Sequence, residues 1–378
     1  TEAPSLLTAD IRGGMDKPGL LGLGDEIKGV TFVPLEVTTD DASLIDGVYD
    51  YAVTDRYIYV LPVKEPRIVL FDRQGRFIRT LVKEGQGPGE FRGILPCIQV
   101  DERNDRLFLF SNNRVWEYTL EGEFIGQSTH EYSVIYMRHI GKDRFAAISF
   151  PFQPFNGGGF GLGLFSRKGD TIAIKNDFYS FLLPHEKSGF TTSIAPAYSD
   201  AQNSVLFKTG SNDTVFCISA DRISAACVLD LKNSDAEVIR SLDVTDMSNL
   251  RIEKKDPKDI FVQDMIEFPG HYYFRLLYNQ GYYIASVDKK TGKTLVEKCV
   301  MPGSIYELAD ANLQHGMQGT RSYRNFPVWG RVIKDELVQV VTPYELNLYK
   351  SLRSITIPQE LDLKGEEGNP VFVFYSLI

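Results

Sequence analysis

Short runs of alternating apolar residues, each preceded by a polar or glycine turn residue, recur six times along the chain. The copies are Asp55 with RYIYVL, Asp105 with RLFLF, Asp143 with RFAAI, Asn203 with SVLFK, Gly270 with HYYFRLL and Asp335 with ELVQVV. Alternation with a period of two predicts a β-strand with one face toward a core. Recurrence of one strand pattern along a chain indicates a repeat architecture.

Further strand-like runs accompany each of the six copies. One run follows every copy, at residues 67–72, 114–119, 162–166, 214–219, 282–288 and 370–376. Another follows the next turn, at residues 76–82, 123–128, 170–175, 223–231 and 293–299. Runs also precede the copies, for example at 95–101, 134–140 and 327–333. Four antiparallel strands in each of six units predict an all-β protein, a six-bladed β-propeller.

Glycines mark the turns between the last two strands of four units. These are Gly75, Gly122, Gly169 and Gly292. Glycine supplies the positive φ that tight hairpins require. The sixth unit ends at Ile378 after its third strand, whereas residues 28–36, KGVTFVPLE, form an unassigned strand. We therefore expect Val30–Leu35 to pair with Val371–Tyr375 and to close the ring, which removes an exposed edge.

The predicted domain organisation is a single propeller over residues 27–378, preceded by an N-terminal extension over residues 1–26. The extension is rich in glycine and turn residues, and we expect it to be loosely ordered. Residues 234–250 and 343–363 carry apolar residues at helical spacing. These two segments predict short helical insertions.

Composition narrows the function classes. Of the 378 residues, 43% are hydrophobic and 24% are charged, as in a soluble globular protein. The net charge of −9 argues against a nucleic-acid partner, and no apolar run is long enough to predict a transmembrane segment. The four cysteines lack the CxxC spacing of a zinc site. Cys217 and Cys227 flank a turn near Asp221, and either a disulfide or two buried thiols is compatible with that spacing.

The segment LVKEGQGPGEFRG, residues 81–93, has three glycines at alternate positions. A dinucleotide-binding loop would need a different spacing and a following helix, and a Walker loop would need Gly-Lys-Ser/Thr. The segment instead lies where the outer strand of the first blade must pass to the inner strand of the second. We expect Phe91 to be the apolar plug at this crossing and Arg92 to lie near a surface where it pairs or faces a ligand.

Candidate ligand-binding residues fall into three groups. The first group occupies the channel-facing ends of inner strands, where propellers place functional side chains, and comprises Asp50, Arg138, Tyr198, Asp264 and Trp329. The second is the aromatic run Phe150–Phe165, with Phe155 as its candidate; aromatic residues on loops bind sugars or peptides, although the favoured interpretation is that Phe152 and Phe155 cover the core between blades. The third is Thr320–Trp329, where Tyr323 and Arg324 suit an anionic or sugar ligand, a stacked structural arginine being the alternative.

Catalytic chemistry has little support in the sequence. The five histidines are scattered, without HxH or HExxH spacing, and no Ser–His–Asp set stands out. Acidic residues Asp40, Asp41, Asp46 and Asp50 lack the spacing of a calcium loop. We therefore expect no catalytic residues, no metal site and no cofactor.

Residues 68–91, IVLFDRQGRFIRTLVKEGQGPGEF, resemble the NHL-type propeller repeat. Residues 29–48 and 366–378 are similar to the two ends of six-bladed β-propeller proteins abundant in Bacteroidetes. This resemblance implies a protein that is exported, either periplasmic or anchored to the outer membrane as a lipoprotein. The GPGEF motif is absent from the second to fifth units, so the resemblance does not imply a symmetric binding mode.

These observations lead to a functional hypothesis. The chain is expected to be a non-enzymatic recognition or scaffold propeller of the cell envelope that binds a glycan, peptide, small molecule or partner protein. The alternative is a propeller hydrolase or lyase with a metal site at the channel mouth, because some NHL-like propellers have such an activity.

Overall fold

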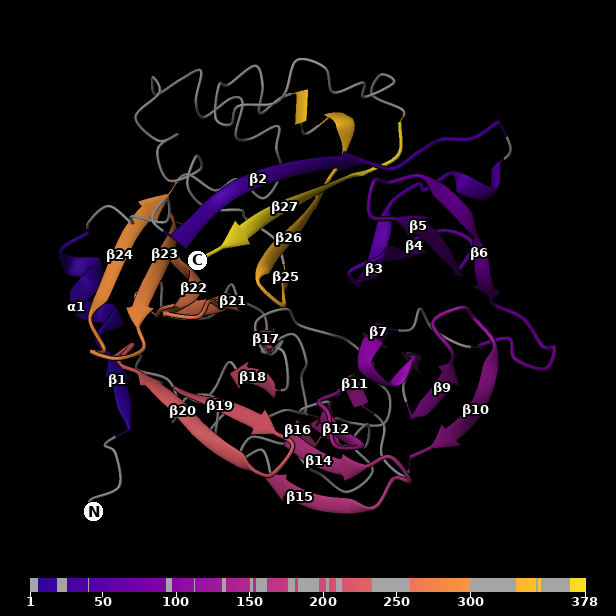
Figure 1. The fold of residues 1–378 in the computed structure, drawn as a ribbon. Helices are drawn as coiled ribbons and strands as arrows, with labels where there is room; N and C mark the ends of the chain where they lie inside the picture. Colours follow the sequence, from indigo (N-terminus) through magenta and orange to yellow (C-terminus); the bar gives the residue numbers. More distant parts are fainter. Residues whose placement is uncertain are drawn as a thin grey trace.

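The computed structural model describes residues 6–18, 26–39, 41–92, 97–111, 113–130, 134–149, 152–153, 162–175, 181–182, 197–201, 204–208, 213–232, 259–279, 281–299, 331–344, 346–347 and 368–378. Six antiparallel sheets stand around a ring, with the innermost strands facing its centre (Figure 1). The six-bladed β-propeller predicted from the strand pattern is confirmed.

The first three blades each contain four antiparallel strands in chain order, with β13 (Phe152–Gln153) left out of the third. Blade 1 comprises β3 (Val48–Val53), β4 (Tyr57–Pro62), β5 (Arg67–Asp72) and β6 (Phe77–Lys83). Blade 2 comprises β7 (Cys97–Asp101), β8 (Arg106–Ser111), β9 (Arg114–Tyr118) and β10 (Phe124–Thr129). Blade 3 comprises β11 (Val134–His139), β12 (Arg144–Ser149), β14 (Leu162–Ser166) and β15 (Thr171–Lys175). A separate parallel pair joins β13 (Phe152–Gln153) to β16 (Phe181–Leu182).

Strands from the N-terminal part of the chain join two of the other three blades, the fourth and the sixth. Blade 4 comprises β17 (Ala197–Ala201), β18 (Ser204–Lys208), β19 (Thr214–Ser219), β20 (Ile223–Leu229) and an added strand, β1 (Leu7–Ala9). Blade 5 comprises β21 (Phe261–Glu267), β22 (His271–Tyr278), β23 (Gly281–Asp288) and β24 (Thr294–Cys299). Blade 6 comprises β25 (Arg331–Ile333), β26 (Glu336–Val341), β27 (Val371–Leu377) and β2 (Ile27–Pro34).

The core lies between blades, because the middle strands of each sheet are buried on both faces. In β4, Ile58 packs in a cluster with Val338 of blade 6, whereas its neighbour Tyr59 packs in a cluster with Trp116 of blade 2. Successive side chains of a strand point to opposite faces, so each blade contributes to two inter-blade clusters. The ring is therefore a series of sheet-on-sheet contacts.

The ring closes through the N-terminal strand. Strand β2 pairs antiparallel with β27, and the register places Val30 opposite Tyr375 and Pro34 opposite Val371. Figure 1 shows the two strands side by side, one in indigo and the other in yellow. The predicted pairing of residues 30–35 with residues 371–375 is confirmed.

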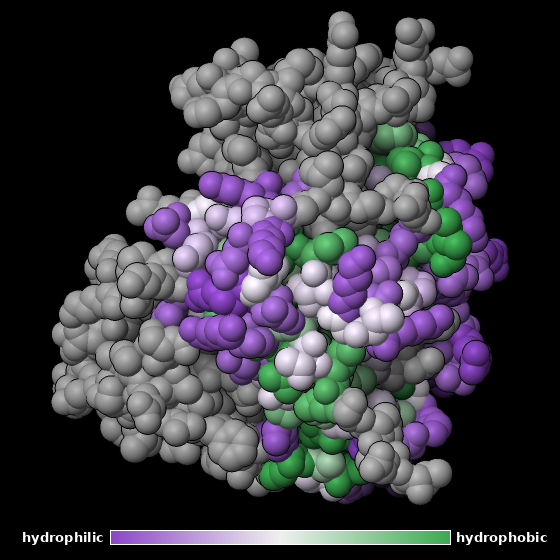
Figure 2. Space-filling view, turned by 90° about the vertical axis from the view of Figure 1, so that its left-hand side faces the viewer, coloured by the Kyte–Doolittle hydropathy of each residue, from purple (hydrophilic) through white to green (hydrophobic). Residues whose placement is uncertain are grey.

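Part of the N-terminal extension is ordered, contrary to our expectation of a loosely ordered segment. Strand β1 pairs parallel with β20, and helix α1 (Ile11–Asp16) follows it. The side chains of Ala9, Ile11 and Met15 are buried in the cluster between blades 4 and 5. These apolar contacts explain the order, because so short a helix gains its stability from packing. Figure 2 shows the side of the molecule that lies to the left in Figure 1. On this side, hydrophilic residues predominate in the middle of the described surface, and hydrophobic residues gather below them.

Turn glycines make contacts between blades as well as tight turns. Gly75 has a φ of +84°, and a Cβ atom added to it would lie 2.2 Å from the carbonyl oxygen of Pro34 in the neighbouring blade. Gly122 similarly approaches Leu81, and Gly169 approaches the ring of His130. Each of these turns therefore packs on the end of the preceding blade's outer strand region.

The crossing between blades 1 and 2 agrees with its structural interpretation. Phe91 is fully buried and packs edge-on against Trp116, with ring centroids 6.5 Å apart. The carboxylate of Glu90 accepts a hydrogen bond of 2.7 Å from the backbone N–H of Gly87. A Cβ atom at Gly85 would collide with that carboxylate. The absence of a side chain at Gly85 thus leaves room for the Glu90 carboxylate against the backbone of the loop.

The remaining sequence expectations have mixed outcomes. Cys217 and Cys227 are thiols without a disulfide, because Cys217 lies opposite Ser224 and Cys227 lies opposite Val215 in the sheet. Burial raises the pKa of Cys227 to about 12. Residues 343–344 and 346–347 are helical, whereas residues 234–250 lie outside the described part of the chain. No helix of the described segments has the length and apolar character needed to span a membrane.

Candidate functional site

A cavity of about 540 Å³ lies at one mouth of the central channel. Its walls are the ends of the inner strands β3, β7, β11 and β25, the turns that follow them, and the start of β18. Among the described residues that line it, five are basic, namely Arg103, Arg138, Lys142, Arg331 and Lys334. Three are acidic, namely Asp55, Asp101 and Glu102.

Asp50 and Arg331 join three blades behind this cavity. Asp50 is 3% exposed, and its carboxylate accepts a hydrogen bond of 2.7 Å from the backbone N–H of Ile98 in blade 2. The guanidinium of Arg331 in blade 6 forms an ion pair with Asp50 and donates a 3.0 Å hydrogen bond to the carbonyl of Tyr51. A buried carboxylate satisfied in this way fixes the inner strands relative to one another.

Lys334 makes a second junction at the rim. Its ammonium lies 2.5 Å from a carboxylate oxygen of Asp55 in blade 1 and also pairs with Glu102 in blade 2. The other oxygen of Glu102 accepts a 2.7 Å hydrogen bond from the backbone N–H of Asp55. These contacts raise the pKa of Lys334 against the opposing influence of desolvation. One blade 6 side chain therefore ties the turns of blades 1 and 2.

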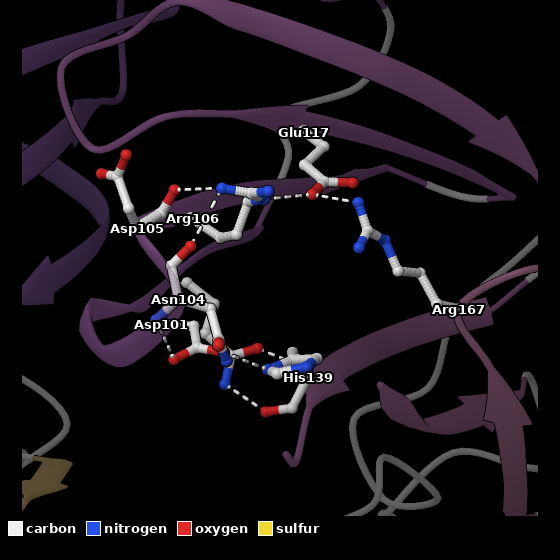
Figure 3. A network of polar contacts seen from close by, with 8 residues as sticks. Asp101, Asn104, Asp105, Arg106, Glu117, His139 and Arg167 are labelled. Atoms are coloured by element: carbon white, nitrogen blue, oxygen red, sulfur yellow. Dashed lines mark hydrogen bonds and ion pairs between the residues drawn. The ribbon is translucent and has the colours of Figure 1, made fainter. Parts of the chain in front are cut away.

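His139 lies at the junction of blades 2 and 3 (Figure 3). The side-chain amide of Gln99 bonds to both the N–H and the C=O of His139, at 2.5 Å and 2.6 Å. Nδ1 of the imidazole lies 3.6 Å from Asp101, whose carboxylate also accepts from Asn104. Burial lowers the pKa of His139, although Asp101 opposes this effect. Burial therefore favours the neutral form of the imidazole.

The same network extends outward along blade 2. Glu117 accepts a 2.7 Å hydrogen bond from Nε of Arg106 and pairs with Arg167 of blade 3 (Figure 3). Arg106 also donates to the backbone carbonyls of Asn104 and Asp105, at 2.9 Å and 2.8 Å. The turn that carries the cavity wall of blade 2 is thereby fixed from behind.

Arg138 and Asp264, two of the predicted residues, occupy inner strands. Arg138 is 3% exposed; its guanidinium donates to the hydroxyl of Tyr136 at 2.7 Å and to the carbonyl of Ile98 at 2.5 Å. Asp264 lies on β21, and burial raises the pKa of its carboxyl to about 6, although Arg275 opposes the shift. Arg138 lines the cavity, and Asp264 is absent from its described lining.

The structure brings together only part of the predicted site. Asp50 and Arg138 both bond to the backbone of Ile98 at the channel. Arg92 is used within its own loop, where its guanidinium donates to the carbonyls of Gly85 and Gln86 at 3.1 Å and 2.7 Å. Tyr198 lies on the inner strand β17, and its side chain is outside the described part. The other predicted residues outside the described part are Phe155, Tyr323, Arg324 and Trp329.

Several residues of the cavity were absent from the sequence prediction. Glu102, Arg103, Lys142 and Lys334 lie in or beside the short turns that end the inner strands. The polar residue before each repeated strand was the signal that could have found them, because it places these turns on one face of the ring. Within the described segments, no three His, Cys, Asp or Glu side chains are grouped so as to hold a metal ion.

Comparisons with known proteins show the fold and the family. A structure solved under the name of an exported protein from Bacteroides fragilis NCTC 9343 is 14% identical, over 99% of this chain and 100% of that chain, with a TM-score of 0.68. A nidogen/laminin complex aligns over 71% of this chain and 93% of that chain, at 10% identity and a TM-score of 0.36. A luciferin-regenerating enzyme aligns over 92% of this chain and 96% of that chain, at 8% identity and a TM-score of 0.40.

No curated protein matches the chain. A family model, however, matches the chain from residue 6 to residue 376. The chain therefore belongs to the family described as a domain of unknown function, DUF4934.

Proposed function

We propose that this propeller is a non-enzymatic binding protein of the cell envelope that takes a glycan or peptide at the channel mouth. The observation that carries the proposal is the cavity of about 540 Å³ with charged walls fixed by contacts between blades. Cavities of roughly 300–1,000 Å³ with a few well-placed polar groups are typical of ligand sites.

Preorganisation of the walls supports a binding role. Asp50 and Lys334 form hydrogen bonds and ion pairs that join blades 6, 1 and 2. The side-chain amide of Gln99 joins blade 2 to blade 3. Side chains held in this way lose little rotamer freedom when a ligand binds. The walls of the mouth are therefore held in place before a ligand binds.

An envelope location is the second part of the proposal. It is supported by the likeness of fold to the Bacteroides fragilis protein named as exported. We also propose that the protein is anchored as a lipoprotein and that its blades are related to the NHL-type repeat. Cell fractionation of the native organism, with detergent partitioning of the membrane fraction, tests it; recovery of the protein in the cytoplasmic fraction alone would contradict it.

Binding is tested on a glycan array and a library of short peptides with the purified chain. Ser204, which lines the cavity, offers a site for a blocking substitution, Ser204→Trp; the matched control is Lys290→Trp on an exposed turn of blade 5. We expect a retained ligand whose binding is abolished by Ser204→Trp and unchanged by Lys290→Trp. Absence of any retained ligand, or turnover of the ligand that stops after metal chelation, would contradict the proposal.

A further inference from the structure

The charge of the cavity differs in sign from that of the whole chain. The chain carries a net charge of −9, whereas the described residues that line the cavity include five basic and three acidic side chains. Asp50, behind the wall, adds one further negative charge. A cleft lined by an excess of one sign concentrates ligands of the opposite sign.

The acidic groups of the mouth are already engaged. Glu102 uses one carboxylate oxygen for Lys334 and the other for the backbone of Asp55. Asp55 itself pairs with Lys334. Asp101 accepts two hydrogen bonds from Asn104, at 3.3 Å and 2.7 Å. A cationic ligand would therefore have to compete with contacts that hold the blades together.

Two basic side chains remain accessible. Arg103 is exposed, and within the described part of the chain it has no side-chain hydrogen bond or ion pair. The ammonium of Lys142 lies 3.1 Å from both carboxylate oxygens of Asp221, with the two side chains 69% and 73% exposed. An ion pair that exposed contributes little and gives way readily to a ligand.

We propose that the ligand carries a carboxylate and that Arg103 and Lys142 bind it, an inference that rests on the binding function proposed above. The planar fork of arginine matches a carboxylate in a bidentate geometry, and lysine adds a point charge from the neighbouring blade. The small excess of positive charge matches a singly charged group, since Asp55, Asp101 and Glu102 would repel a dianion. A uronic-acid saccharide and the C-terminus of a peptide both present this chemistry.

Calorimetric titration with four probes tests the inference and distinguishes the two sources. The methyl glycoside of galacturonate is compared with that of galactose, and N-acetyl-trialanine is compared with its C-terminal amide, at pH 7 and low salt, so that each pair differs by one carboxylate. We expect at least one acidic probe to bind about tenfold or more tightly than its neutral counterpart, a difference of about 1.4 kcal/mol. Its affinity should fall on raising the salt concentration, because the attraction is screened.

Substitutions locate the site of that binding. Arg103→Gln and Lys142→Gln should each weaken the acidic probe by about threefold to tenfold, and Arg103→Lys should be intermediate because it keeps the charge without the fork. Lys290→Gln, a change on an exposed turn outside the cavity, should have no effect. All three positions are exposed, so the melting temperatures of the four variants should stay within about 1–2 °C of the unsubstituted chain.

Three results would overturn the inference. These are equal binding of acidic and neutral probes, an affinity unchanged by Arg103→Gln and Lys142→Gln, and no binding of any probe at 10 mM, about the weak limit of specific affinity. The binding function itself fails separately, when the glycan array and the peptide library also return no ligand that Ser204→Trp blocks.

Discussion

The two halves of the ring are stabilised differently at their outer edges. In blades 1 to 3, the outer strands β6, β10 and β15 are the last strands of their sheets. In blade 4, β1 covers β20; in blade 5, α1 packs on β24; and in blade 6, β2 is itself the outer strand. The N-terminal segment therefore runs along the outside of blades 4, 5 and 6 (Figure 1).

This difference separates local from long-range stabilisation. The contact of blade 1 with blade 2 uses the loop that joins them, through Phe91. The contact of blade 4 with blade 5 instead uses Ile11 and Met15, from residues more than 190 positions earlier in the chain. Ordering of the contact between blades 4 and 5 therefore includes the entropic cost of closing a long loop.

Deletion of residues 1–18 should have the largest effect on stability. It removes β1, α1 and the buried side chains of Ala9, Ile11 and Met15, which fill the cluster between blades 4 and 5. Burial of side chains of this size contributes about 1.5–3 kcal/mol each for the larger two. We expect the free energy of unfolding to fall by more than about 4 kcal/mol and the thermal transition, followed by circular dichroism, to broaden. An unchanged transition would show that the two halves do not differ in this way.

Phe91→Ala should destabilise the first half by about 3–5 kcal/mol, the usual range for removing a fully buried aromatic ring. The loss reflects the cavity left beside Trp116, which is itself buried. Chemical denaturation measures the change, and Ile78→Ala, at a 41% exposed residue of β6, serves as the control. Equal effects of the two substitutions would contradict the role of Phe91 as the plug between blades.

Gly75→Ala should cost about 2–4 kcal/mol at the junction between the two halves. An alanine at a φ of +84° is strained by about 1–2 kcal/mol, and its Cβ atom would lie 2.2 Å from the backbone of Pro34. Gly29→Ala is the matched control, since a Cβ atom there meets nothing within 4 Å. The free energies of unfolding of the two variants, measured by chemical denaturation, should differ by most of that amount. Similar values would mean that the turn of blade 1 moves away from Pro34 without cost.

His130→Phe should have the smallest effect and the clearest dependence on pH. The His130 side chain lies between Phe145 and Phe165, is 4% exposed, and has no hydrogen-bond partner for either ring nitrogen among the described residues. Burial lowers its pKa below the ordinary value of 6.5, so the unfolded chain binds the proton more readily. Stability associated with neutral His130 is thus present above pH 6.5 and is lost as the pH falls below it.

The phenylalanine variant should be about 1 kcal/mol more stable at pH 8, because an unsatisfied buried polar group is removed. Its advantage should grow between pH 6.5 and pH 5. Melting temperatures measured across this range give the comparison, with His139 left in place in both proteins. A constant difference over the whole range would contradict burial of a neutral imidazole between blades 2 and 3.

The alternation of apolar residues and the turn glycines were enough to predict the blades and their closure. Every repeated run is a strand, since its side chains alternate between two inter-blade clusters. The segment LLTADIRGGM could not be predicted as β1 and α1 in the same way. It contains Gly13 and Gly14, poor helix formers, and its order comes from contacts with blades 4 and 5.

The candidate site was predictable only where a single strand defines it. Asp50 and Arg138 lie on the inner strands β3 and β11, which the alternation of apolar residues locates. Lys334 appears in the sequence as an ordinary turn lysine, and its partners Asp55 and Glu102 lie 279 and 232 positions away. Such a junction depends on closure of the ring, which no local pattern of residues encodes.

Hydrogen exchange of the ligand-bound chain tests the central claim, that the channel mouth is the binding site. A ligand taken from the array or the library should slow amide exchange in residues 98–104, 138–142 and 331–334, which form the cavity wall. Residues 63–66, in the turn between β4 and β5 at the opposite end of these strands from the cavity, should exchange as in the free protein. Protection confined to residues 63–66 or to other segments outside the cavity would contradict the account.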